Sequence, residues 1–114
     1  MARILVVEDE MLIAMLLEDT IGDLGHKVVG PAMRVETALS VLESEPIDFA
    51  ILDINIAGKL SFPIADRLRE LAVPFIFASG YGVDGLIDGH RDVAILQKPF
   101  SPDQIAAALL HLKP

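Results

Sequence analysis

The chain has 114 residues, 53% of them hydrophobic, enough for one buried core but too few for two domains, so we expect a single domain over residues 1–114. Nine basic and seventeen acidic residues give a net charge of −8, which argues against direct binding to nucleic acid or to an anionic membrane surface. The chain has no cysteine, which excludes disulfides and thiolate metal sites and favours a cytoplasmic location.

The hydropathy pattern predicts no membrane span. The longest uncharged run, Leu71 to Val83, has thirteen residues and is interrupted by Pro74, Gly80 and Gly82, whereas a spanning helix needs about 20 apolar residues. The N-terminal stretch MARILVVEDE reaches acidic residues too early for a signal peptide. We therefore expect a soluble, cytoplasmic protein.

From the N-terminus onward, short β-branched apolar runs alternate with segments whose apolar residues recur every three or four positions. This alternation predicts an α/β fold in which helices cover both faces of a five-stranded parallel sheet. Strands covered on both faces are apolar almost throughout. The predicted strands are Arg3 to Val7, Lys27 to Gly30, Phe49 to Leu52, Phe75 to Ala78 and Val93 to Leu96.

A helix is predicted after each strand. The first runs from about Leu12 to Leu24, and the second and third follow the second and third strands. Their expected core positions are Ile13, Leu17, Ile21 and Leu24 in the first, Val35, Ala38, Leu39 and Leu42 in the second, and Ile64, Leu68 and Leu71 in the third.

The two C-terminal helices differ in how well the sequence supports them. The segment from Gly82 to Asp92 contains three glycines, each costing about 1 kcal/mol of helix propensity relative to alanine, so we predict a short or mobile fourth helix. The last helix has a capping box, with Ser101 at the N-cap, Pro102 at the first helical position and Gln104 three residues after Ser101. Its expected core positions are Ile105, Leu109 and Leu112.

Polar residues follow four of the predicted strands. Because ligands of open α/β sheets bind outside the carboxyl ends of the strands, we expect these residues to form one site. They are Glu8, Asp9 and Glu10 after the first strand, Asp53 and Asn55 after the third, Ser79 and Gly80 after the fourth, and Gln97 and Lys98 after the fifth.

The composition of this group indicates phosphoryl chemistry. Converging carboxylates raise one another's pKa unless a cation compensates, and the candidate cations are Lys98 and a Mg²⁺ ion, which prefers oxygen ligands. Asp53 can then act as the nucleophile that forms an aspartyl phosphate. Lys98 would neutralise charge on the transferring group, and the Ser79 hydroxyl would donate a hydrogen bond to it.

Four motifs spread over essentially the whole chain closely resemble the receiver domain of two-component response regulators. They are VVEDE, ILDINIAG, the serine of FASGYG, and LQKPF. The resemblance implies a flavodoxin-like (βα)5 three-layer sandwich with strand order 2-1-3-4-5, and a histidine kinase or phosphotransfer protein as donor. By this resemblance Glu8 contacts Mg²⁺ through water, Asp9 and Asp53 bind it directly, Asn55 offers its backbone carbonyl, Ser79 is the switch hydroxyl, Lys98 binds phosphate, and the Lys98–Pro99 bond is cis.

The chain departs from the family pattern at the switch. Most receivers place an aromatic residue three positions before the lysine, where this chain has Ile95. Tyr81 lies two residues past Ser79, as in single-domain receivers with a Phe-Ala-Thr-Gly-Tyr motif. We expect Tyr81 and the glycine-rich segment after it to replace the missing switch.

Candidate partner contacts lie beside the site. Leu12, Leu16, Pro99 and Phe100 are either partly buried or form an apolar docking patch for the kinase, as the family resemblance implies. Output would go through a downstream protein partner or a further domain. His26, His90 and His111 are scattered and predict no zinc site.

Two other functions remain open. Haloacid-dehalogenase-type phosphatases share the Asp, Ser or Thr, and Lys pattern, but their second aspartate, a general acid and base, is here Asn55, which cannot titrate. A degenerate receiver that only binds partners is the other alternative. We expect a switch that catalyses only its own phosphorylation and dephosphorylation, rather than a metabolic enzyme.

Overall fold

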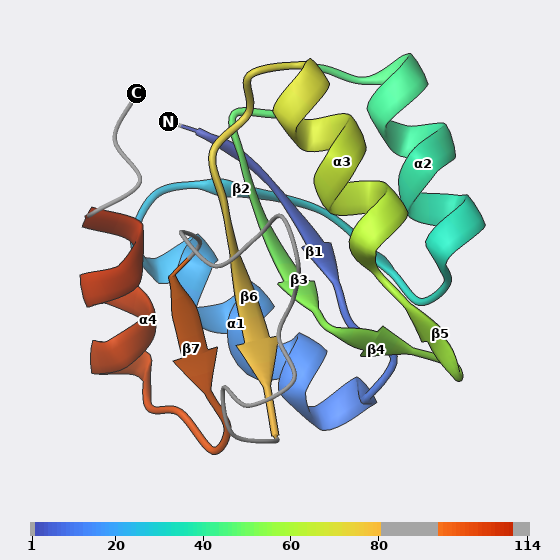
Figure 1. Cartoon of the computed structure of the whole chain (residues 1–114). Coiled ribbons are helices and arrows are strands. Elements are labelled where there is room, and N and C mark those ends of the chain that lie inside the picture. Colours follow the sequence, from blue (N-terminus) through green and yellow to red (C-terminus); the bar gives the residue numbers. More distant parts are fainter. Residues whose placement is uncertain (1, 81–93, 111–114) are drawn as a thin grey trace.

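The computed structural model describes residues 2–80 and 94–110 and contains a central parallel sheet with helices on both faces (Figure 1). The sheet order is β2-β1-β3-β6-β7, and all its strand pairs are parallel. Counted along the chain, this is the predicted order 2-1-3-4-5. The elements are β1 (Arg3–Val7), α1 (Met11–Asp23), β2 (Lys27–Ala32), α2 (Val35–Ser44), β3 (Phe49–Asp53), β4 (Asn55–Ile56), β5 (Lys59–Leu60), α3 (Phe62–Glu70), β6 (Phe75–Ser79), β7 (Ile95–Gln97) and α4 (Pro102–Leu110).

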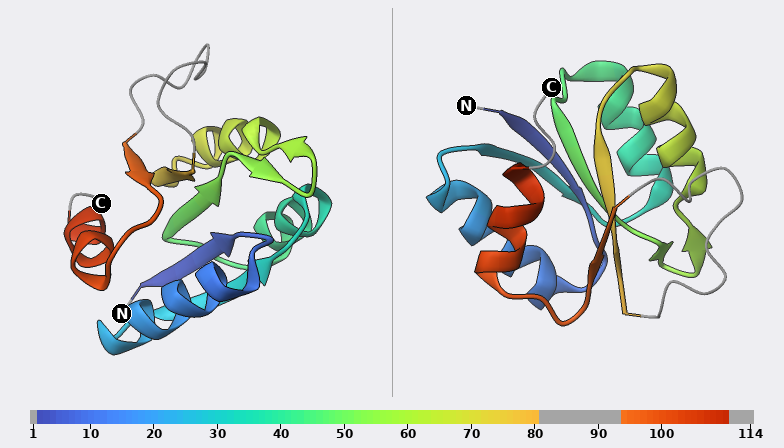
Figure 2. Two further views of the ribbon diagram at one scale, coloured as in Figure 1. Left: turned by 90° about the horizontal axis from the view of Figure 1, so that it is seen from below. Right: turned by 60° about the vertical axis from the view of Figure 1, so that its left-hand side comes forward.

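The sheet separates two apolar cores. Helices α1 and α4 cover one face and α2 and α3 the other, which makes three layers (Figure 2). Side chains of a strand alternate between the faces, and in β1 Leu5 and Val7 pack toward α2 and α3 while Ile4 and Val6 pack toward α1 and α4. The central strands β3 and β6 are buried at every residue. Burial on both faces of the sheet explains why the sequences of these strands are apolar almost throughout.

The predicted capping box of α4 is confirmed. The Gln104 backbone N–H donates to Ser101 Oγ at 3.2 Å, and the Ser101 N–H donates to Gln104 Oε1 at 2.7 Å. These reciprocal bonds satisfy donors that the first turn of a helix leaves unpaired. The helix therefore begins where the sequence indicated.

Several predicted element ends were wrong. Strand β2 continues past Gly30 to Ala32, with Gly30 at φ +101° and a cis bond to Pro31. Strands β3 and β6 each extend one residue, to Asp53 and Ser79. Leu24 and Leu71 follow their helices as exposed C-cap residues rather than core residues, because the chain turns there.

The sequence did not predict the hairpin formed by β4 and β5, which pair antiparallel between β3 and α3. Its two-residue turn consists of Ala57 and Gly58, at φ +50° and +84°. Such turns favour Asn-Gly or Asp-Gly because both central residues adopt positive φ. Because alanine occupies the first position, the turn lacks the sequence pattern from which it could have been predicted.

The fourth helix predicted between Gly82 and Asp92, the start of the last strand at Val93, and Leu112 lie outside the described residues. Among the residues that are described, none of the helices is both long and apolar enough to span a bilayer.

Candidate functional site

A lysine surrounded by carboxylates lies at the carboxyl ends of β1, β3 and β7. Lys98 Nζ is 2.8 Å from Glu8 Oε1, 2.9 Å from Asp53 Oδ2 and 3.2 Å from Glu10 Oε1. The Lys98 side chain is 9% exposed, and that of Glu8 is 1% exposed. The predicted convergence of Glu8, Asp53 and Lys98 is therefore observed.

Burial and mutual contact change the pKa of both Glu8 and Lys98. Burial raises the pKa of Glu8 to about 7, and the hydrogen bond from Lys98, which favours the ionised form, offsets this only in part. For Lys98, burial alone would lower the pKa, but the hydrogen bonds and negative charges of Glu8 and Asp53 outweigh burial and raise it. Lys98 is therefore charged at neutral pH, while Glu8 titrates there.

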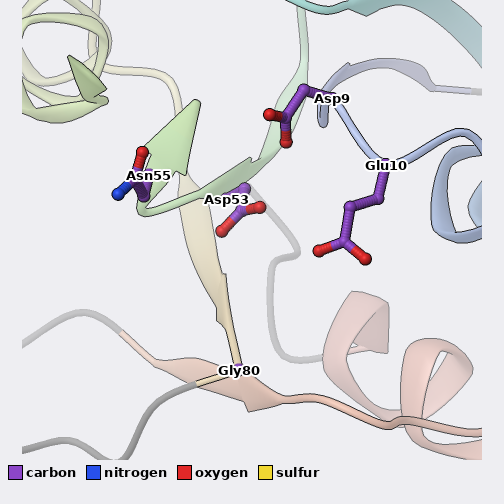
Figure 3. Close-up of a pocket in the computed structure, with 5 residues that line it drawn as sticks. All are labelled: Asp9, Glu10, Asp53, Asn55 and Gly80. Carbon is purple, nitrogen blue, oxygen red and sulfur yellow. The ribbon is translucent and has the colours of Figure 1, made fainter. Parts of the chain in front are cut away.

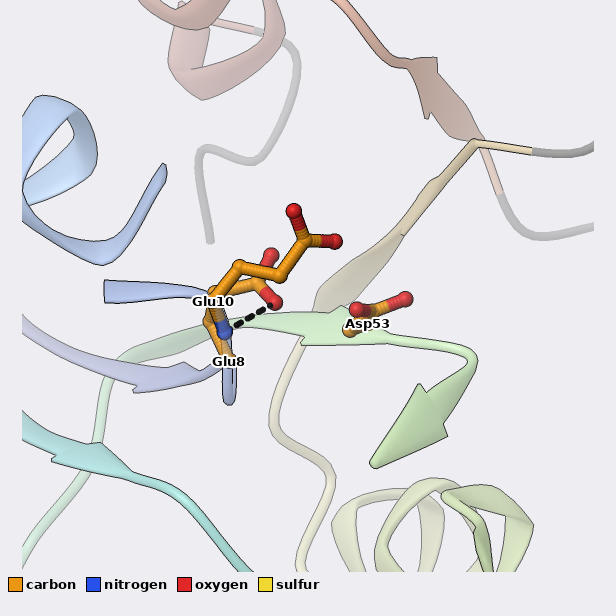
Figure 4. Close-up of side chains that lie close together, drawn as sticks. All are labelled: Glu8, Glu10 and Asp53. Atoms are coloured by element: carbon orange, nitrogen blue, oxygen red, sulfur yellow. Dashed lines mark hydrogen bonds between the residues drawn. The ribbon is translucent and has the colours of Figure 1, made fainter. Parts of the chain in front are cut away.

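Three carboxylates of the described residues, those of Glu8, Glu10 and Asp53, lie within 4.8 Å of one another (Figure 4). The Glu10 backbone N–H also donates to Glu8 Oε2 at 3.1 Å. Sequence reasoning placed Glu10 at this edge but gave it no role. The available signal was its place directly after Glu8 and Asp9, at the end of the first predicted strand.

The carboxylate of Asp9 points to a different contact. Its Oδ2 accepts a hydrogen bond from the Ala57 N–H at 3.0 Å, in the turn between β4 and β5. Asn55 also holds this turn, because its Oδ1 accepts a hydrogen bond from the Gly58 N–H at 3.2 Å. The roles of Asp9 as a direct metal ligand and of the Asn55 carbonyl stay predictions.

An open pocket of about 410 Å³ brings these residues together (Figure 3). It is lined by Asp9, Glu10, Asp53, Asn55 and Gly80. Its side-chain donors are carboxylate and amide oxygens, the ligands that Mg²⁺ prefers, with no imidazole or thiolate among them. The donor set therefore fits the predicted Mg²⁺.

The end of β6 supplies the predicted hydroxyl. Ser79 is buried, and its carbonyl accepts a hydrogen bond from the Lys98 N–H at 2.7 Å. Ala78, the residue before it, pairs with Asp53 across the sheet, so Ser79 and Asp53 lie at one edge. The Lys98–Pro99 bond is cis, as the resemblance implied. Ile95 packs against the core beneath α2 and α3, and the switch role predicted for Tyr81 falls outside the described residues.

The predicted docking patch is corrected in part. Phe100 is 7% exposed and belongs to the core beneath α1 and α4, because the segment after Lys98 leads directly into α4 on that face. Leu16 is half-buried against the same core, while Leu12 is 82% exposed and Pro99 is also exposed. Sequence reasoning missed two further exposed apolar residues of α1, Met11 and Met15.

The histidine within the described residues has a structural contact. His26 Nδ1 accepts a hydrogen bond from the Ala2 N–H at 3.0 Å, which ties the loop after α1 to the start of β1. His90 and His111 lie outside the described residues.

The sequence matches the response regulator receiver domain family over residues 4–110. It is 35% identical over 112 residues to the phyllosphere-induced regulator PhyR of Methylorubrum extorquens, covering 94% of this chain and 42% of PhyR. The chain spans about half the length of the first curated relatives it matches.

Two solved structures resemble the chain over nearly their full length. The solution structure of SdrG from Sphingomonas melonis Fr1 is 44% identical, with a TM-score of 0.88, and the match covers 98% of this chain and 96% of SdrG. The BeF3-activated conformation of SdrG from Pseudomonas melonis Fr1 is also 44% identical, with a TM-score of 0.83 and coverage of 96% and 94%.

Proposed function

The chain belongs to the response regulator receiver domain family, and on that premise we propose that it accepts a phosphoryl group on Asp53 and thereby changes how it binds a partner protein. The observation that carries this proposal is the contact between Lys98 Nζ and Asp53 Oδ2 at 2.9 Å, at the rim of an oxygen-lined pocket. The Asp53 side chain is 10% exposed, so its carboxylate is held in place yet accessible from the pocket.

The proposed reaction is transfer from a phosphohistidine of a histidine kinase or histidine phosphotransfer protein. A carboxylate oxygen of Asp53 attacks phosphorus, the bond between phosphorus and the imidazole nitrogen breaks, and the imidazole nitrogen takes up a proton. Asp53 then carries an acyl phosphate, which water later hydrolyses. No other general base is needed, because a carboxylate oxygen can attack phosphorus without passing a proton to another residue.

The surrounding residues neutralise charge during transfer. Lys98 faces the oxygens of the phosphoryl group, and the Ser79 hydroxyl donates a hydrogen bond to one of them. When bound, Mg²⁺ would supply two further positive charges next to the transferring phosphoryl group. Glu8 through water, Asp9, Asp53 and the Asn55 carbonyl would hold the ion.

The site does not suit turnover of small phosphate esters. A phosphatase of the haloacid-dehalogenase type needs a titratable acid two residues after its nucleophile, and this chain has Asn55, which instead accepts a hydrogen bond in the turn between β4 and β5. We propose that the chain is not a metabolic enzyme and catalyses only the gain and loss of its own phosphoryl group.

The proposed setting is the cytoplasm, with a downstream protein as the output partner. The net charge of −8 disfavours direct output through nucleic acid or a membrane. Exposed Leu12 at the start of α1, two residues after Glu10 of the pocket lining, is the proposed contact for the kinase.

Mass spectrometry after incubation with acetyl phosphate and Mg²⁺ tests the proposal. The natural chain should gain the mass of one phosphoryl group, and Asp53→Asn should gain none. An unmodified natural chain, with Mg²⁺ shown to bind, would favour the degenerate receiver. Continuous hydrolysis of phosphate monoesters would instead favour the phosphatase.

A further inference from the structure

The three N–H donors of the Lys98 ammonium group are all occupied by carboxylates. Glu8 lies at 2.8 Å, Asp53 at 2.9 Å and Glu10 at 3.2 Å, and an ammonium group has three donors. One phosphoryl oxygen on Asp53 can take over the donor that Asp53 now holds, but a second can bind Lys98 only after Glu8 or Glu10 leaves. Besides Asp53, Glu8 and Glu10 are the carboxylates that can exchange with the phosphoryl group at Lys98.

Glu10 is the partner that can leave at least cost. Its side chain is 61% exposed and has the longest of the three distances, whereas Glu8 is 1% exposed. A released Glu10 carboxylate would be hydrated, but Glu8 would have to break buried contacts. Asp53 stays beside Lys98 in both states, because the phosphoryl group is bonded to its carboxylate.

The start of α1 offers a place for the released carboxylate. Glu10 is the N-cap residue of α1, but its side chain makes no capping hydrogen bond, and the first turn has no acidic residue. The first N–H groups of a helix lack partners within the helix and attract negative charge. The exposed Met11, Leu12 and Met15 lie on the same part of α1.

We propose that Glu10 is a positioning residue that occupies one donor of Lys98 while Asp53 is unmodified, and moves to the start of α1 when a phosphoryl oxygen takes that donor. This proposal rests on the function proposed above. According to this proposal, the negative charge of Glu10 disfavours phosphorylation of Asp53. It also links the state of Asp53 to the charge beside the exposed apolar residues of α1.

Beryllofluoride with Mg²⁺, used as a mimic of the phosphoryl group, provides the test. Its affinity is measured by NMR titration for the natural chain, for Glu10→Gln and for Asp19→Asn, which removes one exposed charge elsewhere on α1. Glu10→Gln should bind the mimic about fivefold more tightly, the factor that one unit charge at about 4 Å produces in water. Asp19→Asn should match the natural chain.

The Glu10 side-chain carboxyl ¹³C resonance provides a second readout. In the natural chain it should shift on saturation with the mimic, as the contact with Lys98 is replaced, and it should not shift in Asp53→Asn. A purely structural role for Glu10 would leave this resonance unchanged.

The possible failures can be told apart. Equal affinity of the natural chain and Glu10→Gln, with binding still dependent on Asp53, would overturn the role of Glu10 and leave the proposed function standing. Weaker binding of both the mimic and Mg²⁺ by Glu10→Gln would make Glu10 a metal ligand and overturn the exchange. Absence of binding in both proteins would overturn the proposed function and the exchange with it.

Discussion

Replacing Lys98 by methionine should destabilise the fold by an amount that grows with pH. The substitution removes the cation from three carboxylates that lie within 4.8 Å of one another. Removing one partner of a buried ion pair costs about 3–5 kcal/mol when the remaining charge cannot be neutralised. Glu8 can be neutralised by protonation, so the cost depends on the pH.

The sign follows from the pKa of Glu8, which burial raises from 4.5 to about 7 in the folded natural chain. Between these values the folded state binds more protons than the unfolded state, so this group lowers stability as pH rises toward 7, by about 3 kcal/mol in all at about 1.4 kcal/mol per pH unit. Without Lys98, whose hydrogen bond lowers this pKa, the decline continues above pH 7.

The difference in unfolding free energy between the natural chain and Lys98→Met should therefore be about 2 kcal/mol larger at pH 8.5 than at pH 6. Urea unfolding followed by circular dichroism, with EDTA present, measures it. Lys59→Met is the matched control, because it breaks the exposed pair with Glu36 and should change stability little at either pH. If Lys98→Met destabilised the fold equally at both pH values, the reasoning that Glu8 is neutralised by protonation would be refuted.

Three further outcomes are expected. The affinity for Mg²⁺, measured by calorimetry, should rise as pH increases from 6 to 8, because Glu8 must lose its proton. Glu8→Gln should reduce this pH dependence. A pH dependence as steep in Glu8→Gln as in the natural chain would contradict the role of Glu8. Gly30→Ala should destabilise the fold by about 1–3 kcal/mol, because the added Cβ would lie 2.7 Å from the Ala32 nitrogen and residue 30 has a φ of +101°. Gly22→Ala is the control: its added Cβ would have nothing within 4 Å, so stability in the same urea assay should be unchanged or higher. Leu12→Asp should reduce phosphoryl transfer from the kinase without changing phosphorylation by acetyl phosphate, because this side chain is 82% exposed; equal loss with both donors would point to misfolding.

Local and topological signals predicted most of the fold. The five strands were found because buried parallel strands are apolar on both faces, and the start of α4 because its capping box uses only neighbouring residues. The convergence of Glu8, Asp53 and Lys98 followed from the rule that parallel strands end at a common edge. The hairpin of β4 and β5 was missed because its Ala-Gly turn carries a weak signal.

The chain by itself determined the alternation of strands and helices and the set of oxygen donors and one lysine at the strand ends. Only the tertiary structure decided which of the three consecutive acidic residues face Lys98. The chain bends at Asp9, and Glu8 and Glu10 contact Lys98, whereas Asp9 accepts a hydrogen bond from the Ala57 N–H. Which acidic residues face Lys98 depends on the position of that lysine, 88 residues beyond Glu10. The burial of Phe100 likewise depends on where α4 packs. Residue order specifies which polar residues follow each strand, but contacts between distant segments set which of them lie together.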